Sequence, residues 1–372
     1  MIKKVGYLVF AFFFTLFRAA PLNHSKVFFV ATHDDSEEGN IGLTAEAIRT
    51  AMPDKKCIFL TKKDGIRSPV SFFLVKAYHM ATAATIFLDN EFMPMAYTPI
   101  NPRAKVVQLW HGTGTIKKFG LDSDEKKVVR LAKKANERLT HLIVSSEKTK
   151  KQYAKAFGVP PEKIYVLGLP RTDLILNQER MQKMRKRFYE QYPTLKGKRC
   201  TLYAPTFRDK EVDCPVFSLN FDTFVSCMSE EEVLLLRLHP HVAANCPETV
   251  WGRYKGKIVN VSEYPGVATL LAVSERLITD YSSIIFEYCL LNRPIFFYAY
   301  DYEEFRQNGR DFYEDYKEFV PGPIAYTQSE LEQLWRENEI DKEKLEHFRE
   351  NAFQYVDKNA TNRLLELIFD EK

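Results

Sequence analysis

Four short motifs in this 372-residue chain combine histidine, basic, hydroxyl and acidic side chains, and each begins near the end of an apolar run. The first occupies residues 110–120, with the sequence WHGTGTIKKFG. Small residues such as Gly112 let backbone N–H groups approach an anion, while His111 and Lys117 supply a proton acceptor and a positive charge. The motif is not a P-loop, and it lacks the third glycine of a dinucleotide-binding fingerprint. A glycine-rich turn with a buried histidine is the structural alternative.

Two further motifs add cations. Residues 202–209, LYAPTFRD, place Arg208 where its planar guanidinium could bind a phosphate, although an ion pair with the next residue explains it equally well. Residues 236–241 read LRLHPH, and alternate residues of a strand face the same way, so Arg237 and His239 should share one face. A cation beside an imidazole suits a diphosphate.

The fourth motif, residues 277–287, reads LITDYSSIIFE. Its candidate substrate-binding residues are Thr279, Asp280, Ser282, Ser283 and Glu287. One of the two serines could cap the following helix, whose free N–H groups and positive dipole end would bind an anion. The glutamate could reach a ribose hydroxyl. A plain helix cap explains the serines equally well.

The four motifs converge on the handling of a diphosphate without a metal ion. Their cations and imidazoles are His111, Lys117, Arg208, Arg237 and His239. No D-x-D-type carboxylate pair accompanies them, so we expect the protein itself to balance the phosphate charge. The six cysteines show no zinc-site spacing, which indicates a reduced setting without a structural metal. The net charge of +4 is too modest to argue for nucleic acid.

The elements that position these motifs alternate between strand and helix. Strands are predicted at residues 26–32, 57–60, 84–89, 106–110, 141–146 and 164–167, and again at 199–204, 233–239, 257–261, 276–279 and 294–298. Helices fall between them, for example at 44–51, 124–139 and 147–157. This pattern predicts two doubly wound α/β domains, with ligands at the carboxyl ends of the strands. We expect domains at 23–190 and 191–372, preceded by a separate segment, 1–22.

The N-terminal segment is predicted to bind a membrane surface. Its apolar run, 5–17, is shorter than the ~20 residues that a spanning helix needs. Arg18 makes a poor signal-peptide cleavage site. We therefore expect an interfacial anchor in which Phe12 and Phe13 enter the headgroup boundary while Lys3 and Lys4 meet anionic lipid. A signal or spanning segment and a first buried helix of the domain are the alternatives.

A second membrane contact is predicted on helix 124–139. Its basic stripe consists of Lys127, Arg130, Lys134 and Arg138, opposite an apolar stripe that can pack inward. Simple solvated charge is the alternative interpretation of this stripe.

Together, the motifs resemble the CDP-glycerol glycerophosphotransferase family of teichoic acid synthesis. The resemblance covers roughly residues 100–325 and includes a further motif, NRPIFFY, at 292–298. It implies a GT-B-like pair of Rossmann-type domains and a monotopic position at the cytoplasmic face of the membrane. It also implies that His111 and His239 are essential, and that the turn 279–283 and Glu287 hold the nucleotide half of the donor.

The implied reaction transfers glycerol phosphate from CDP-glycerol to a hydroxyl of a lipid-linked, undecaprenyl diphosphate saccharide acceptor, with release of CMP. His111 would take the proton from the acceptor hydroxyl. The chain length resembles the primase-like members, and a homo-oligomer is possible. The alternatives are a CDP-ribitol ribitolphosphotransferase, a GT-B glycosyltransferase that uses a nucleotide sugar, and a non-catalytic membrane adaptor, because fold alone does not fix function.

Overall fold

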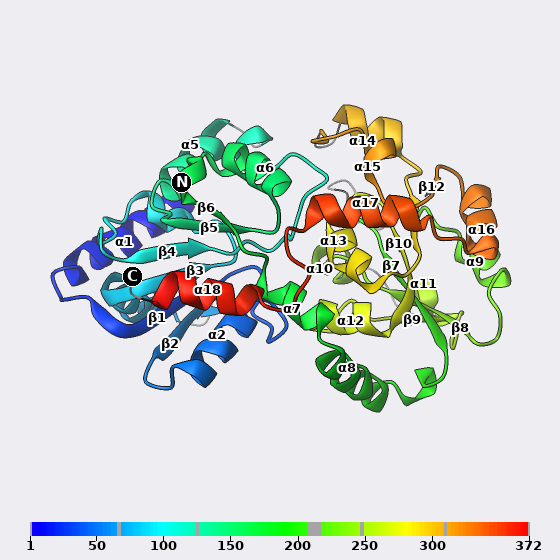
Figure 1. Cartoon of the computed structure of the whole chain (residues 1–372), viewed down its shortest axis with the longest axis horizontal. Coiled ribbons are helices and arrows are strands. Elements are labelled where there is room, and N and C mark those ends of the chain that lie inside the picture. The colour runs from blue at the N-terminus through cyan, green and yellow to red at the C-terminus, as the bar shows by residue number, and fades with distance from the viewer. Residues whose placement is uncertain are drawn as a thin grey trace. The chain divides into compact units, whose positions relative to one another are not determined.

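The computed structural model divides the chain into two compact units. It describes residues 2–64, 68–123, 126–206, 208, 217–245, 249–308 and 311–370. Unit 1 comprises Met1–Gly114, Lys118–Asp173 and Ala352–Lys372, and unit 2 comprises Thr115–Lys117 and Leu174–Asn351. Each unit contains a six-stranded sheet, coloured blue to green in unit 1 and green to orange in unit 2 (Figure 1).

The sheet of unit 1 has the strand order β2-β1-β3-β4-β5-β6, and every pairing in it is parallel. Its strands are β1 (Asn23–Ala31), β2 (Lys56–Thr61), β3 (Ala83–Leu88), β4 (Lys105–Gln108), β5 (His141–Val144) and β6 (Ile164–Val166). The chain passes from β1 to β2 on one side and then returns to β3 on the other side of β1. The strand order therefore reverses between β1 and β3, and ligands of open α/β sheets bind at such a point.

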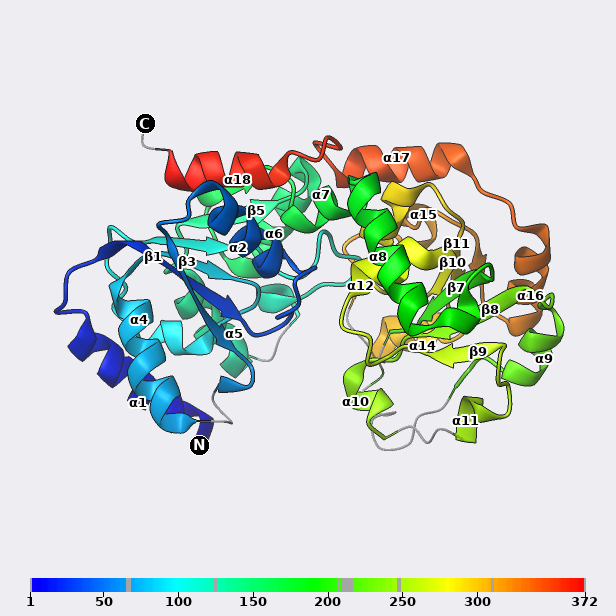
Figure 2. The ribbon, with the colours of Figure 1, turned by 90° about the horizontal axis from the view of Figure 1, so that it is seen from below.

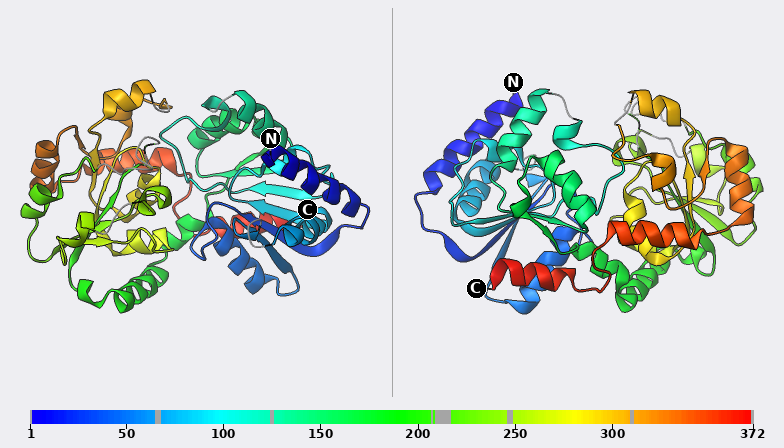
Figure 3. Two further views of the ribbon diagram at one scale, coloured as in Figure 1. Left: turned by 180° about the vertical axis from the view of Figure 1, so that it is seen from behind. Right: turned by 45° about the horizontal axis from the view of Figure 1, so that its top comes forward.

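Helices cover both faces of this sheet because its central strand is apolar on both sides. Phe28 and Val30 of β1 belong to one buried cluster, whereas Val27 and Phe29 belong to another. The helical elements of unit 1 are α1 (Ile2–Phe17), α2 (Asn40–Ala51), η1 (Ser71–Lys76), α4 (Ala77–Thr82), η2 (Met93–Ala96), η3 (Gly120–Asp122), α5 (Lys126–Asn136), α6 (Glu147–Phe157), η4 (Pro161–Lys163), most of α7 (Pro170–Leu176) and α18 (Ala360–Phe369). The C-terminal helix α18 lies beside α2 (Figure 3).

The sheet of unit 2 repeats this arrangement, with the parallel order β12-β11-β10-β7-β8-β9. Its strands are β7 (Arg199–Ala204), β8 (Glu232–Leu236), β9 (Ile258–Asn260), β10 (Ser274–Thr279), β11 (Ile295–Tyr298) and β12 (Ile324–Ala325). Its helical elements are α8 (Gln178–Gln191), η5 (Pro193–Leu195), α9 (Phe221–Ser226), α10 (Pro240–Ala243), α11 (Thr249–Gly252), α12 (Val267–Val273), α13 (Ile284–Tyr288), η7 (Cys289–Leu291), α14 (Tyr302–Asn308), α15 (Tyr316–Phe319), α16 (Gln328–Glu337) and α17 (Lys342–Ala352). Here the order reverses between β7 and β10.

The predicted pair of parallel α/β sheets is confirmed, but the units divide the chain differently from the expected ranges 23–190 and 191–372. Helix α8 packs on α12 and so belongs to unit 2, which moves the boundary to residues 173–174. The last segment returns to unit 1, because Leu364 and Ile368 of α18 are buried against the sheet. The helix expected at 124–139 ends at Asn136.

Residues 1–22 do not form a separate segment, since helix α1 is part of the core of unit 1. Phe10 and Phe14 are fully buried, and the Phe10 ring lies 5.2 Å from that of Phe72 and 5.5 Å from that of Phe92. Figure 2 shows α1 beside α4. Phe12, by contrast, is 66% exposed. In the part of the chain that the structure describes, no helix is both long enough and apolar enough to cross a membrane.

The burial of α1 predicts opposite effects at two neighbouring phenylalanines. Phe10→Ala should lower the free energy of unfolding by about 3 to 5 kcal/mol, because it removes a buried ring and leaves a cavity. Phe12→Ala, the matched control, should change it by less than about 0.5 kcal/mol. Urea denaturation of the full chain measures both. Equal losses in the two variants would contradict the buried position of α1.

Candidate functional site

His111 lies three residues beyond the end of β4 in a fixed orientation. Its Nδ1–H donates a hydrogen bond to the backbone oxygen of Asp89, at 3.1 Å. With the proton on Nδ1, Nε2 carries the lone pair and can accept a proton. The His111 ring stacks on the ring of His33, with centroids 3.7 Å apart and planes 12° from parallel. Trp110 covers it at 4.0 Å.

The side chain of Asp89 ties a second loop to the same place. This carboxylate is 2% exposed and follows β3 directly. It accepts hydrogen bonds from the backbone N–H groups of Thr32, His33 and Asp34, which follow β1, at 2.9, 3.1 and 2.8 Å. Burial raises the pKa of the Asp89 carboxyl to about 6, although these three N–H groups oppose the rise. One buried carboxyl group therefore joins the loop after β1 to the loop after β3, at the point where the strand order reverses.

Arg171, which lies in α7, adds further hydrogen bonds to this network. Its guanidinium donates to the backbone oxygen of His111 at 2.7 Å and pairs with Asp34 at 3.2 Å. Asn40 accepts from the backbone N–H of Arg171 and donates to the backbone oxygen of Trp110, at 3.1 and 3.0 Å. These bonds hold Trp110 at φ 56°, a left-handed conformation that costs a non-glycine residue roughly 1 to 2 kcal/mol.

The glycine-rich loop after His111 is held by a residue of α6 and by a residue that directly follows β5. The Tyr153 hydroxyl donates to the backbone oxygen of Gly112 at 2.9 Å, and the Ser145 hydroxyl donates to that of Thr113 at 2.8 Å. A Cβ atom on Gly112 would come within 3.1 Å of the backbone oxygen of Gly114, so the turn leaves little room for a side chain there.

The environment of His111 keeps its imidazole neutral at physiological pH. Burial, together with the charges of His33 and Arg171, lowers the pKa of His111 to about 3, although the hydrogen bond to the backbone of Asp89 opposes this shift. A neutral ring with a fixed tautomer can accept a proton at Nε2 and can equally act as a hydrogen-bond acceptor. Unit 1 thus presents one oriented base at the carboxyl end of its sheet.

Lys117 is six residues from His111 but belongs to unit 2. It pairs with Phe312 in an isolated antiparallel bridge, and the backbone N–H of Tyr313 donates to the oxygen of Ile116 at 3.1 Å. Its ammonium group lies 5.8 Å from the centre of the Phe305 ring. The predicted association of Lys117 with the phosphate stays a prediction.

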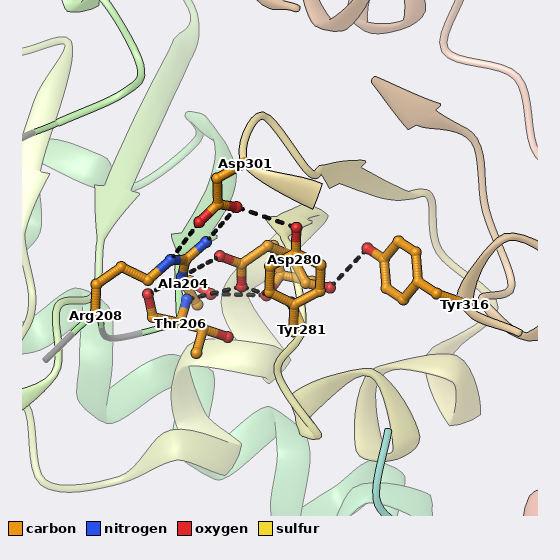
Figure 4. Close-up of polar contacts among 8 residues, drawn as sticks. Ala204, Thr206, Arg208, Asp280, Tyr281, Asp301 and Tyr316 are labelled. Carbon is orange, nitrogen blue, oxygen red and sulfur yellow. Dashed lines mark hydrogen bonds and ion pairs between the residues drawn. The ribbon is translucent and has the colours of Figure 1, made fainter. Parts of the chain in front are cut away.

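In unit 2, Arg208 forms ion pairs with two carboxylates at the reversal point between β7 and β10. Its Nε and Nη2 donate to the Asp301 carboxylate at 2.9 Å each, and its Nη1 donates to Asp280 at 2.8 Å and to the backbone oxygen of Thr206 (Figure 4). The Arg208 side chain is 11% exposed, and although burial alone would lower its pKa, the charges of the two carboxylates raise it. Asp209 lies outside the described residues.

Tyrosines and backbone groups complete this cluster around the two carboxylates. The Tyr281 hydroxyl donates to Asp301 at 3.1 Å, and the Tyr316 hydroxyl donates to the backbone oxygen of Asp280 at 3.0 Å (Figure 4). Asp280 also accepts from the backbone N–H of Thr206 at 2.8 Å. The geometry therefore gives Arg208 and Asp280 a clear role in fixing the loops after β7 and β10 to each other.

Arg237 and His239 follow β8, which ends at Leu236, so the strand expected to reach residue 239 is shorter. The Arg237 guanidinium donates to the backbone oxygens of Val261, at 3.1 Å, and Tyr264. His239 is exposed, and its backbone oxygen accepts from the backbone N–H groups of Val242 and Ala243, in α10, at 2.9 Å each. Arg237 thus braces the loop after β9.

The serine turn after β10 differs in detail from the predicted cap. The Thr279 hydroxyl donates to the backbone oxygen of Ala204 at 2.7 Å and so joins β10 to β7. The Ser282 hydroxyl accepts from the N–H of Ile284 at 3.4 Å, whereas Ser283, the residue before α13, makes no side-chain cap. Glu287 is 8% exposed within α13.

The structure thus places the predicted residues in two groups, one in each unit. His111 and Gly112 belong to unit 1, and the other predicted catalytic and substrate-binding residues belong to unit 2. The four motifs do not contain the residues that orient the site, namely His33, Asp34, Asn40, Asp89, Arg171 and Asp301. The available signal for three of them was a polar residue at the end of the apolar run 84–89, Asp89, and the two polar residues directly after the run 26–32, His33 and Asp34. Within the described ranges, no group of three or more histidine, cysteine or acidic side chains could hold a metal ion.

Curated relatives of this chain act in teichoic acid synthesis. The chain is 34% identical over 376 residues to a teichoic acid poly(ribitol-phosphate) polymerase of Bacillus spizizenii, in a match that covers 99% of this chain and 60% of that protein. It is 30% identical over 368 residues to a teichoic acid ribitol-phosphate primase of the same organism, and that match covers 94% of this chain and 92% of the primase.

Solved structures give the same fold. The wall teichoic acid polymerase TagF superposes with a TM-score of 0.83 and 24% sequence identity, over 99% of this chain and 94% of that chain. The model of the CDP-glycerol:poly(glycerophosphate) glycerophosphotransferase family matches residues 12–370. The chain therefore belongs to this family of transferases, as the four strand-end motifs indicated.

Proposed function

We propose that this chain transfers a polyol phosphate from a CDP-activated polyol to a hydroxyl group of a lipid-linked acceptor, with release of CMP, in teichoic acid synthesis. The observation that carries the proposal is the oriented, neutral imidazole of His111, whose Nδ1–H is bound to Asp89 and whose Nε2 is left as the base. Membership of the transferase family supports it.

In the proposed reaction, Nε2 of His111 takes the proton as the acceptor oxygen forms its bond to the polyol-side phosphorus. The bond between that phosphorus and the bridging oxygen breaks, and CMP leaves with the electron pair. Unit 2 holds the nucleotide half of the donor through the turn 279–283 and Glu287, while His239 and Lys117 balance charge on the phosphates. No metal ion is required in this proposal.

We propose glycerol phosphate as the transferred group, from the donor that names the family. Ribitol phosphate is the second candidate, because the two curated relatives described above are named for ribitol phosphate. A primase-like reaction, which adds the first unit to the acceptor, is proposed with a polymerising reaction as the alternative, because one of these two relatives is named a primase and the other a polymerase.

The donor and the base can be tested together. CDP-glycerol, CDP-ribitol and UDP-sugars are each incubated with the chain and a lipid-linked disaccharide, with and without a chelator, and the nucleotide released is measured. We expect CMP from a CDP-polyol. His111→Ala should lower kcat by about 10² to 10³, because the general base is lost. His141→Ala, the matched control at the opposite end of the sheet, should stay active.

Release of UDP alone would favour the glycosyltransferase alternative. Full transfer by His111→Ala would remove the proposed role of His111. Binding of no nucleotide at all would favour the adaptor.

For Arg208 we propose a positioning role in place of direct phosphate binding, since its donors face Asp280 and Asp301. Asp301→Asn should lower the free energy of unfolding by about 3 kcal/mol, because it leaves a buried guanidinium without one of its two counter-charges. Glu179→Gln breaks the exposed pair with Lys183 and should change nothing measurable. A fully stable Asp301→Asn variant that loses only nucleotide affinity would instead assign Arg208 to the donor phosphates.

We also propose that the chain works at the cytoplasmic face of the membrane, and that the outer side of α1 contacts the lipid. The exposed residues Val5, Leu8, Phe12 and Leu16 form an apolar stripe at helical spacing, between 47 and 66% exposed. Of the predicted basic residues on and after α5, Arg130 and Lys134 are exposed and Arg138 is half-buried. The side chains of Lys3 and Lys127 lie outside the described residues.

The lipid contact predicts a charge effect. The double variant Phe12→Glu and Leu16→Glu should bind vesicles containing anionic lipid several-fold more weakly in a co-sedimentation assay. The reason is that two carboxylates replace apolar side chains that would otherwise enter the lipid interface. Val356→Glu, which adds charge at a 47% exposed position away from α1, is the control. Unchanged vesicle binding by the double variant would contradict the proposed surface.

A further inference from the structure

We propose that His33 is a positioning residue for His111, and that the stacked pair keeps the His111 imidazole in place and neutral so that its Nε2 can act as the base. The inference rests on the proposed function. It adds a residue from the loop after β1, which none of the four motifs contains.

The rings of His33 and His111 are in stacking contact. The two rings are almost parallel, with centroids 3.7 Å apart, which is full van der Waals contact between two flat surfaces. The Trp110 ring lies 4.0 Å from that of His111, tilted by 31°. His111 therefore contacts two aromatic rings, and the bond from Nδ1 to the backbone oxygen of Asp89 fixes the orientation of its ring.

Asp89 binds both His33 and His111. The carboxylate of Asp89 holds the backbone of His33, and the backbone oxygen of the same residue holds the His111 ring. A single residue thus fixes both members of the stack. His33 cannot leave the stack by a movement of its backbone unless it breaks hydrogen bonds to a buried carboxyl group.

The charges around His111 also disfavour its protonation. The titratable and charged groups around His111 are His33 and Asp34 after β1, Asp89 after β3 and Arg171 of α7. The Asp34 carboxylate is engaged by Arg171, at 3.2 Å. Two imidazolium rings at stacking distance repel each other, and Arg171 adds to that repulsion, so a proton on His111 is disfavoured from two sides. The His33 ring therefore helps to keep the base free at Nε2.

Two substitutions separate the steric part of this role from the electrostatic part. His33→Phe keeps a flat ring in the stack but removes the charge. His33→Ala removes both and also admits water to the face of His111. Because burial and the His33 charge each lower the pKa of His111, this pKa should rise in both variants, and it should rise further in His33→Ala.

The test is an NMR titration of the histidine ring protons in the full chain, with kcat and KM measured across the same pH range. We expect the His111 titration to move to higher pH in His33→Phe, with kcat within about twofold of the unsubstituted chain above that pKa. In His33→Ala, kcat should fall about tenfold at all pH values while KM for the donor changes little, because orientation is lost.

His141→Phe is the control, since it removes another half-buried imidazole, stacked 5.0 Å from Tyr165, without touching His111. It should leave the His111 titration and kcat unchanged. An unshifted His111 titration in both His33 variants would overturn the inference. The titration does not depend on transfer, so it tests the pair even if no CDP-polyol proves to be a donor, and that second result would overturn only the proposed function.

Discussion

The buried carboxyl group of Asp89 is the contact on which the site of unit 1 depends. It lies where the strand order reverses, and there two adjacent strands send their following loops in opposite directions. Without a shared residue, the loops after β1, β3 and β4 would each need separate hydrogen-bonding support to adopt one conformation. Asp89 supplies it to the first through its side chain and to the third through its backbone oxygen. The orientation of His111 is therefore a property of the sheet and not of its own flexible, glycine-containing loop.

Unit 2 uses the opposite sign of charge at the equivalent place. There the guanidinium of Arg208 joins the loop after β7 to the turn after β10 and to Asp301 in the loop after β11. In both units, a largely buried ionisable side chain lies where the strand order reverses. It joins neighbouring loops through hydrogen bonds to their backbone or side chains. A charged group away from water is stable only when its hydrogen-bonding capacity is met, so each cluster strongly favours one arrangement of its loops.

The N-terminal helix shows how one sequence pattern can serve two purposes. Its run of apolar residues extends around the whole helix, and a helix of that kind must cover apolar surface on more than one side. The core of unit 1 covers the side of Phe10 and Phe14. The stripe around Phe12 and Leu16 stays exposed, which is why the same helix is both part of the domain and the proposed lipid contact.

The sequence by itself determined the two parallel sheets, most of their strands and the location of the four motifs at strand ends. Strands that are buried on both faces must be continuous apolar runs, and the polar residues after them then mark the carboxyl edge. Local signals were also sufficient for the end of α6, where Gly158 adopts the left-handed conformation at φ 62°.

Only the tertiary structure decided the partners of the functional residues. His111 contacts residues 22 positions away in Asp89 and 60 positions away in Arg171, and Arg208 pairs with Asp301, 93 positions away. Likewise, α18 returns to unit 1 from the far end of the chain. In a parallel sheet, strands that are neighbours in space are separated in sequence by a crossover, and the strand order is not written in any single segment. Which side chains meet at the reversal point therefore depends on that order.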